Sequence, residues 1–555
     1  MKRRIKTEMK KMDAEIIRLE KVLHEYSITM CPLIQRPYVW GKDEVNQLIS
    51  DILMWITDPK NEGKAYYLGQ IMVKEMSNDK LDGITRNLIY EGQQRITSVS
   101  MLELALLSFY QENPNLKHPD FDLNSLITAL TINGDFNNPK LILTERDREE
   151  YNNLLEGKMG NGQLSAMFQI IKKQINRKNH LQLVRGLSMV DVARIKLAPD
   201  ENAEVIFNSM NSTGKPLSKL DQLRGVCLLN FDLEQQKQFF ENKWKPIEEV
   251  FRKYIKDDTQ FINGWAMLNT SIKLEYLSKQ SLTSLRSFDG SGAIDTIYDY
   301  AMWLKNTIES SNQAEGNHLI QMLLDMKYPL GIIGVGMINE LTENYQITRH
   351  EREILLKLFE SYCVRAWICK SKGPAKVPGL VDKIAKYYKN GSSNMFRDLS
   401  RLFSGTLNAK FCDIPSNSVI QEVLLSKDWN RDNPKLMLCM LENKLNPRSG
   451  DLSNMTLEHI CATKGIPLNK GDVDLKNTIG NFSLLPRSLN SKLSNLDFKT
   501  KKTMKNGFDE STLLIDEYLK EHEEFGEDQI TERTILLSDD ICKIWPEYNA
   551  IMQEV

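Results

Sequence analysis

The pair Glu458-His459 and two later asparagines, Asn481 and Asn490, carry side chains suited to phosphodiester hydrolysis. This reaction needs a base that activates water and a divalent cation that holds the phosphoryl charge. Imidazole titrates near neutral pH, so His459 suits the role of base. A cation such as Mg²⁺ or Mn²⁺ prefers oxygen ligands, which Glu458 and the Asn490 amide can supply. The alternative for a single Glu-His pair is that the histidine is an ordinary surface or core residue without a catalytic role.

A basic segment, residues 487–506, follows these groups. Its basic residues are Arg487, Lys492, Lys499, Lys501, Lys502 and Lys505, and its only acid is Asp497. Such a run beside catalytic residues predicts a surface that follows DNA phosphates, and we assign all but Lys505 to it. The alternative is a solvated helix face.

A second group of residues has the features of an anion site. A predicted strand runs through Glu91-Gly92 into a helix that begins near Gln93-Gln94-Arg95. Helix N-terminal amides and the helix dipole favour an anion, and glycine allows it to come close to the backbone. Arg95 can bind phosphate oxygens with its fork, and both glutamines add neutral donors. Alternatively, Arg95 is a structural partner of Glu91.

Two further segments supply candidates for the same site. Gln35-Arg36 precedes Pro37, and nothing in the local pattern requires a charge at Arg36, whereas Tyr38 and Trp40 are predicted core residues. Residues 207–217 contain Asn211, which either contacts a ligand or builds a turn. In the structural alternative, Ser218 and Asp221 only cap the next helix.

The elements that must position these residues are read from apolar periodicity. Strands are predicted at 28–34, 66–73, 87–90, 189–197, 455–460 and 479–485, with helices at 12–26, from Asp43, at 97–109 and over most of 230–430. The fold class is therefore α+β and helix-rich. Its predicted segments are 1–27 (a leading helix), 28–229, 230–425 (a helical spacer) and 426–555.

Composition limits the classes of protein that fit. The chain has 555 residues, 72 Lys plus Arg against 74 Asp plus Glu, and a net charge of −2. This is no bulk polycation, so any nucleic-acid surface must be local. The scattered cysteines include no CxxC pair, which excludes a zinc ribbon and favours free thiols in a reducing cytoplasm. No signal peptide or membrane span is expected, because no apolar stretch is long enough.

Four segments together resemble the N-terminal domain of GmrSD-type and SspE-type restriction proteins. They are residues 34–40 (IQRPYVW), 67–71 (YLGQI), 91–97 (EGQQRIT) and 207–217 (FNSMNSTGKPL). The resemblance implies a ParB/sulfiredoxin-like α/β domain that binds or hydrolyses GTP, ATP or CTP and senses modified DNA. It assigns the nucleotide to Gln35, Arg36, Glu91, Gly92, Gln93, Gln94, Arg95 and Asn211. The usual signature is Asp-Gly-Gln-Gln-Arg, so Glu91 is a departure, and the lack of a cysteine near Arg95 favours the ParB-like comparison.

Residues 457–460 (LEHI) and 479–485 (IGNFSLL) resemble the C-terminal nuclease domain of the same families, an HNH (ββα-metal) endonuclease. The resemblance implies that His459 is the general base and that Glu458 and Asn490 hold the metal. Asn481 would hold the loop that carries His459, and Asn495 falls where the family often has another asparagine. Cys461-Ala462 replaces the frequent Pro-Gln, which alters the loop more than the chemistry.

The expected function is therefore modification-dependent DNA restriction against phage, in which the nucleotide domain gates metal-dependent nicking by the HNH domain. The modification can be hydroxymethylated or glucosylated cytosine or a phosphorothioate linkage, and a homodimer is left open. One alternative is a nucleotide-switched DNA-binding protein with a degenerate nuclease domain. Another is an RNA-cleaving toxin.

Overall fold

The chain forms two compact units, which are Met1–Trp244 with Leu282–Ile294, and Lys245–Ser281 with Asp295–Val555. The computed structural model describes residues 13–33, 35–76, 83–116, 122–198, 201, 218–228, 233–269, 290–310, 317–344, 346–369, 377–404, 413–461, 468–487, 489 and 496–555.

The first unit is built on a six-stranded mixed sheet with strand order β1-β8-β3-β4-β2-β7. The strands are β1 (Asp13–Arg18), β2 (Ser27–Met30), β3 (Tyr66–Glu75), β4 (Thr85–Glu91), β7 (Leu141–Ile142) and β8 (Val190–Leu197). A separate hairpin pairs β5 (Thr131–Ile132) with β6 (Asp135–Pro139). Strand β2 runs parallel to both β4 and β7, whereas β3 runs antiparallel to β4. The predicted strands at 66–73, 87–90 and 189–197 are confirmed.

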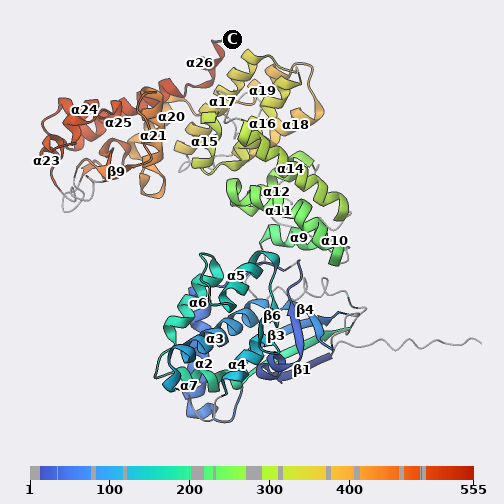
Figure 1. Cartoon of the computed structure of the whole chain (residues 1–555). Coiled ribbons are helices and arrows are strands. Elements are labelled where there is room, and N and C mark those ends of the chain that lie inside the picture. The colour runs from blue at the N-terminus through green and yellow to red at the C-terminus, as the bar shows by residue number, and fades with distance from the viewer. Residues whose placement is uncertain are drawn as a thin grey trace, which may run out of the picture. The chain divides into compact units, whose positions relative to one another are not determined.

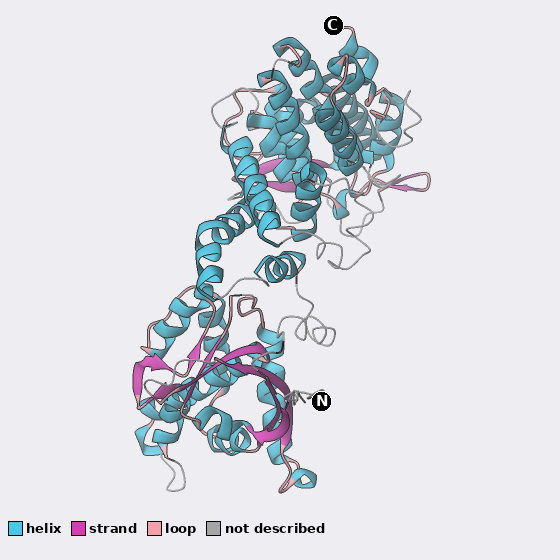
Figure 2. Cartoon of the chain, turned by 90° about the vertical axis from the view of Figure 1, so that its right-hand side faces the viewer, coloured by secondary structure: helices cyan, strands magenta, loops and turns pink. Residues whose placement is uncertain are grey.

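Helices cover the sheet (Figures 1 and 2). They are α1 (Leu19–His24), α2 (Lys42–Thr57), α3 (Gln93–Glu112), α4 (Leu123–Leu130), α5 (Glu145–Leu155), α6 (Gln163–Gln174), α7 (His180–Ser188), α9 (Lys219–Leu228) and α10 (Leu233–Phe239). Side chains of β3 alternate between the two faces, as the strand period requires. Ile71 and Val73 join the main core with α2, α3 and α6, whereas Met72 packs in a second cluster with Leu228 of α9. Helix α3 is buried along most of its length because it lies inside this core.

The predicted leading helix is wrong for part of its length. Residues 13–18 form β1, which pairs antiparallel with β8, and only residues 19–24 form a helix. The apolar spacing suggested one buried stripe, yet Ile16 is 74% exposed, whereas Leu19 is buried. Backbone pairing with β8 therefore outweighs a helical periodicity that covers only about two heptads.

The second unit is mainly helical. Its helices are α11 (Lys245–Val250), α12 (Asp258–Asn269), most of α14 (Gly290–Ser310), α15 (Asn317–Asp325), α16 (Pro329–Glu343), α17 (Arg349–Ile368), α18 (Val377–Asn390), α19 (Met395–Arg401), α20 (Asn417–Ser426), α21 (Pro434–Leu445), α23 (Phe498–Thr503), α24 (Glu517–Glu521), α25 (Glu527–Ile544) and α26 (Tyr548–Met552). The helical character predicted for residues 230–430 is confirmed where the chain is described. In the whole described part of the chain, no helix is both long enough and apolar enough to cross a bilayer.

Two short hairpins interrupt these helices. Strand β9 (Met455–His459) pairs antiparallel with β12 (Phe482–Pro486), and β10 (Asn469–Lys470) pairs with β11 (Val473–Asp474). The predicted strands at 455–460 and 479–485 thus form one hairpin, although residues 479–481 make a 3₁₀ turn before β12 begins. Residues 295–555 form part of a single compact unit. The predicted domain boundaries therefore gain no direct test and stay predictions.

Candidate functional site

The first candidate site lies where β4 passes into α3. Gly92 joins them with φ of 93°, a left-handed conformation that favours glycine. A Cβ at this position would lie 2.7 Å from the Ile71 side chain and 3.0 Å from the Gln70 carbonyl of neighbouring β3. The glycine is therefore required by the close approach of β3, and the N-terminus of the long helix α3 opens at the edge of the sheet.

The loop after β2 reaches this same edge because β2 and β4 are parallel and their carboxyl ends lie together. Gln35 is buried, and its Nε2 donates to the Tyr90 carbonyl at 2.6 Å. Its own carbonyl accepts a bond from Arg224 at 3.0 Å. The structure thus places Gln35 beside the end of β4, as a residue that fastens the loop.

Gln94 also holds this loop. Its Oε1 accepts the backbone N–H groups of Val39 at 2.8 Å and Trp40 at 3.3 Å, while Nε2 donates to the Pro37 carbonyl at 3.1 Å. Both ends of the amide are used inside the fold. One N–H of the amide is left over, so the assignment of Gln94 to phosphate stays a prediction.

Arg95 makes the ion pair that was its structural alternative. Its Nη1 lies 3.3 Å from Glu91 Oε1 and donates to the Gln70 carbonyl at 3.1 Å. The guanidinium covers Gly69, where a Cβ would come within 3.2 Å of it. Both side chains of the pair are about a quarter exposed, at 27% and 23%. Such a pair is weakly held, so an incoming anion can compete for the guanidinium.

Arg36 also lies close enough to the Glu91 carboxylate to feel its charge. Burial lowers the pKa of the Arg36 guanidinium, while the carboxylates of Asp221 and Glu91 act to raise it. Glu91 thus lies in the field of two arginines, Arg36 and Arg95. Arg36 and Arg95 thus bring two guanidinium groups to the start of α3, and their positive charge favours an anion here.

Gln93 differs from its neighbour Gln94. It is only 3% exposed, and neither Oε1 nor Nε2 finds a hydrogen-bond partner within the described residues. Leaving buried polar atoms unpaired costs about 1–3 kcal/mol. An amide kept this way in the first turn of α3 is therefore suited to a ligand.

Two other predicted positions have different outcomes. Asn211 lies outside the described residues. Ser218 caps α9, since its Oγ accepts the Asp221 N–H at 3.1 Å. Arg224 was not predicted from the sequence. It is buried and donates to the Asp221 carboxylate at 2.9 Å and to the Gln35 backbone carbonyl. The Asp–Arg spacing of three on a helix was the available signal.

The second candidate site is the β9–β12 hairpin, where His459 pairs with Phe482. The imidazole packs on the Phe482 ring with centroids 4.6 Å apart, and Nε2 lies 3.3 Å from Asn477 Oδ1. Burial lowers the pKa of His459, so the ring is neutral near pH 7 and can accept a proton. Asn477 was missed because only the folded turn brings it to the ring.

The strongest contact of this site is an ion pair that the sequence did not predict. Lys501 Nζ lies 2.6 Å from Glu458 Oε1 and donates to the His459 carbonyl at 2.6 Å. The Lys501 and Glu458 side chains are only 1% and 8% exposed. Lys502 is also buried, and donates to the Lys520 and His522 carbonyls.

Lys501 and Lys502 therefore do not belong to a DNA-contacting surface, and this prediction is wrong for both. The carbonyl groups of β9 and of the end of α24 draw the two ammonium groups inward. Arg487 and Lys499 are exposed, so their assignment to DNA stays a prediction. Lys492, Asn490 and Asn495 lie outside the described residues.

Asn481 holds the chain that follows His459. Its Oδ1 accepts the Cys461 N–H at 2.8 Å, and its Nδ2 donates to the Lys476 carbonyl at 2.9 Å. Its backbone carbonyl accepts the Ile460 N–H at 2.9 Å. This is the positioning contact that the family resemblance implies, and the side chain is fully buried.

Helix α25 supports the hairpin from behind. A Cβ on Gly480 would lie 2.2 Å from the Ile530 carbonyl, so only glycine fits there. The buried Arg533 donates to the carbonyls of Gly480 at 2.8 Å and Phe482 at 2.7 Å. Ser483 donates to the buried Asp516 at 2.5 Å. The residues around Asn481 thus serve mainly to fix the hairpin.

The donor set for a metal is small. Where the chain is described, no group of three or more His, Cys, Asp or Glu side chains could hold a metal ion. Glu458 offers one carboxylate, with Oε1 paired to Lys501. One carboxylate fits a Mg²⁺ ion that keeps water and substrate phosphate as its other ligands, but not a closed protein centre.

Comparison with known families covers both candidate sites. Residues 19–228 match the family model described as the GmrSD restriction endonuclease, N-terminal domain. Residues 414–539 match the one described as the GmrSD restriction endonucleases, C-terminal domain. No curated protein matches the chain.

Proposed function

Because the chain belongs to the GmrSD restriction endonuclease family, whose two domains supply both sites, we propose how this endonuclease is controlled and how it cuts. DNA is its substrate. In our proposal the β9–β12 hairpin nicks modified DNA, and nucleotide binding at the start of α3 gates the cut. The observation that carries the proposal is His459, a half-buried imidazole whose pKa is lowered by burial and which is held between Asn477 and the Phe482 ring.

His459 takes the proton from the attacking water. The Asn477 amide oxygen can only accept a hydrogen bond, so the ring nitrogen facing it, Nε2, carries the proton. The other nitrogen, Nδ1, is then the free base. Asn481 fixes the chain just after His459, and Lys501 fixes the His459 carbonyl, so the backbone that carries the ring is held in place.

A divalent cation, Mg²⁺ or Mn²⁺, completes this site, and Glu458 is the described residue that would hold it. When bound, such an ion stabilises the charge that develops on the phosphoryl group. Lys501 meanwhile holds Glu458 by one oxygen. The carboxylate is thus placed next to the base before any substrate arrives.

The nucleotide is a triphosphate bound at the N-terminus of α3. Its phosphates are held by Arg36, by Arg95 and by the helix amides that follow Gly92, while Gln93 gains the partners that it lacks within the fold. Phosphate competes with Glu91 for Arg95, which links nucleotide binding to a change in an ion pair. GTP, ATP and CTP are all candidates.

The test is plasmid nicking by the purified protein with Mg²⁺, on matched DNA with and without hydroxymethylated or glucosylated cytosine or phosphorothioate links, each with and without nucleotide. His459→Ala should lower the rate by about 10²–10⁴-fold or more. The control His350→Ala changes an exposed histidine of α17 and should cut normally. Full nicking by His459→Ala, or equal cutting of RNA, rejects the proposal.

A second candidate is a nucleotide-switched DNA-binding protein whose hairpin no longer cuts. The ion pair between Glu458 and Lys501 favours it, because the ammonium uses an oxygen that a metal would otherwise bind. Excess Mn²⁺ separates the two. Nicking that rises with Mn²⁺ supports the nuclease, and DNA binding without any cutting supports the switch.

A further inference from the structure

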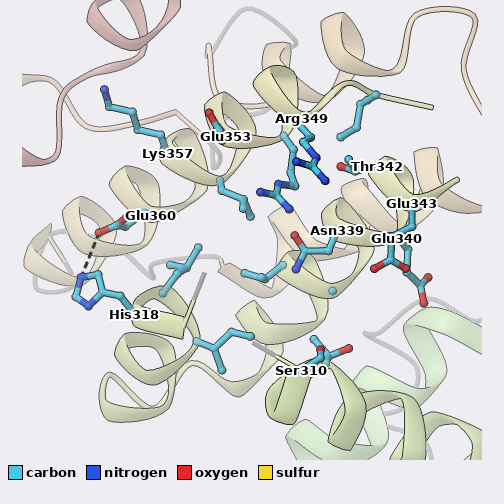
Figure 3. Close-up of a pocket in the computed structure, with 18 of the residues that line it drawn as sticks. Ser310, His318, Asn339, Glu340, Thr342, Glu343, Arg349, Glu353, Lys357 and Glu360 are labelled. Atoms are coloured by element: carbon cyan, nitrogen blue, oxygen red, sulfur yellow. Dashed lines mark ion pairs between the residues drawn. The ribbon is translucent and has the colours of Figure 1, made fainter. Parts of the chain in front are cut away.

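A cavity of about 1300 Å³ lies in the second unit, among α14, α15, α16 and α17 (Figure 3). Its volume exceeds the roughly 300–1,000 Å³ of common small-molecule sites. Its lining includes arginine, lysine, glutamate, asparagine and histidine side chains. It is therefore not a packing defect of an apolar core.

Several of its charges are already matched inside the fold. Glu340 accepts the Trp303 indole N–H at 2.5 Å and the Tyr388 hydroxyl. Glu360 pairs with Lys444 at 2.9 Å and accepts the Trp545 indole N–H at 3.0 Å. These carboxylates thus serve the packing of the helices.

Two arginines in the first turns of α17 are not matched. Arg349 and Arg352 are three residues apart and so share one helix face. Among the residues that the structure describes, neither makes an ion pair, and the buried Nε of Arg352 has no hydrogen-bond partner. Native proteins seldom leave such a donor unsatisfied without a reason.

The opposite wall is formed by α16. Figure 3 shows Arg349, Thr342 and Asn339 directed toward the same part of the cavity. Guanidinium, hydroxyl and amide donors together, beside the positive end of the 20-residue helix α17, form a surface for an oxyanion.

Two carboxylates complete the lining. Glu343 and Glu353 are exposed, and neither makes an ion pair within the described chain. They disfavour a ligand that is only anionic and accept N–H groups instead. Phosphate oxygens and nucleobase amino groups are joined in a nucleotide, and carboxylates do accept from base amino groups.

We propose that this cavity binds a nucleotide, with its phosphate on Arg349 and Arg352 and its base toward one of the two carboxylates, Glu343 or Glu353, which lie on opposite sides of Arg349 (Figure 3). The site is separate from the one at α3, since it uses residues of the other unit only. Such a site would give a ligand to the helical region between residues 228 and 414, which neither family match covers.

The test measures binding of ATP, GTP, CTP and inorganic pyrophosphate to the full chain by calorimetry. The variants are Arg349→Met with Arg352→Met, Arg95→Ala, and the control Arg401→Met, which removes an exposed arginine of α19. Loss of each guanidinium should weaken cavity binding by about tenfold to a hundredfold. Arg95→Ala should leave a nucleotide-binding event that the cavity variant lacks, and the control should bind like the parent.

Thermal unfolding provides the second measurement. At one fixed nucleotide concentration, the unfolding temperature of Arg95→Ala should rise more than that of a chain that carries Arg95→Ala and both cavity changes. The proposal is overturned if Arg95→Ala alone removes all nucleotide binding, or if the cavity variant binds every probe like the parent. It is also overturned if the cavity variant without ligand unfolds well below Arg401→Met, because the arginines would then be structural.

Discussion

The turn at Gly92 and the hairpin at His459 are both built from short motifs, yet they use their polar side chains differently. At the turn, Gln93 keeps an unpaired amide and Arg95 is held by one partly exposed ion pair. At the hairpin, Asn481 and Lys501 are buried. The Asn481 amide bonds to the backbone at Cys461 and Lys476, and the Lys501 ammonium bonds to Glu458 and to the His459 carbonyl. In our proposal, the first region receives the nucleotide, whereas the second holds the imidazole of His459 in place.

The same difference extends to buried charge. In the hairpin unit, Glu458 is paired with Lys501, and Asp516 lies 3.7 Å from Arg533. In the first unit, Glu103 of α3 is buried, and its Oε2 has no hydrogen-bond partner within the described residues. Changing one member of each set tests whether the contrast is energetic as well as geometric.

The largest expected effect comes from Lys501→Met. Removing one partner of a buried pair leaves Glu458 unmatched, which should lower the free energy of unfolding by about 3–5 kcal/mol. Lys499→Met, two residues away on an exposed position of the same helix, should change it by less than about 0.5 kcal/mol. Urea unfolding of both variants measures the difference. Equal stability, with DNA affinity lost only in Lys501→Met, would return Lys501 to the DNA-binding surface.

Glu103→Gln should have the opposite sign. Burial raises the pKa of Glu103 to about 8, while Lys140 opposes the shift and Glu20 adds to it. The unfolded chain releases this proton near the ordinary glutamate pKa of 4.5, so the folded state loses stability as pH rises from there toward 8. Raising the pH from 5 to 7 should therefore stabilise Glu103→Gln relative to the parent by about 2–3 kcal/mol in the free energy of unfolding. Parallel pH dependences of the two proteins would show that Glu103 is ionised when folded.

Much of the fold was predictable because its signals are local. The strands at 66–73, 87–90 and 189–197 are apolar runs whose period matches a buried sheet. The segment 13–18 was not predictable, because β1 exists through its pairing with β8, far along the chain. No local spacing reports such a partner.

The candidate sites divide in the same way. His459 and Asn481 could be found from residue type and order, since their chemistry does not depend on a distant neighbour. Asn477 and Lys501 could not, because the imidazole and the carboxylate they contact are 18 and 43 residues away. A run of lysines gives the same composition whether it faces water or, as at Lys501, a buried carboxylate.

Arg95→Ala tests whether the turn at Gly92 binds nucleotide. It should weaken triphosphate binding by about tenfold to a hundredfold, because the fork contributes a charge-assisted hydrogen bond. Arg95→Lys should restore little, since a point charge does not reproduce the fork. Basal nicking should persist while its response to nucleotide is lost. Unchanged nucleotide titration would instead make Arg95 a structural partner of Glu91.

The smallest expected effect is a shift in pH dependence from Asn477→Asp. In the parent, burial keeps the pKa of His459 below its usual 6.5, so nicking should rise with pH with a midpoint below 6.5. A carboxylate at residue 477 would face the imidazole at hydrogen-bond distance and favour its protonated form. The acid limb of the rate profile should then move up by about one pH unit, leaving the rate at pH 8 closer to that of the parent. Asn477→Ala removes the hydrogen bond without adding charge, so it should lower the rate and leave the acid limb where it was or slightly lower. If the Asp and Ala variants share one acid limb, the group that titrates is not His459, and the hairpin is locked around an imidazole that takes no part in the reaction.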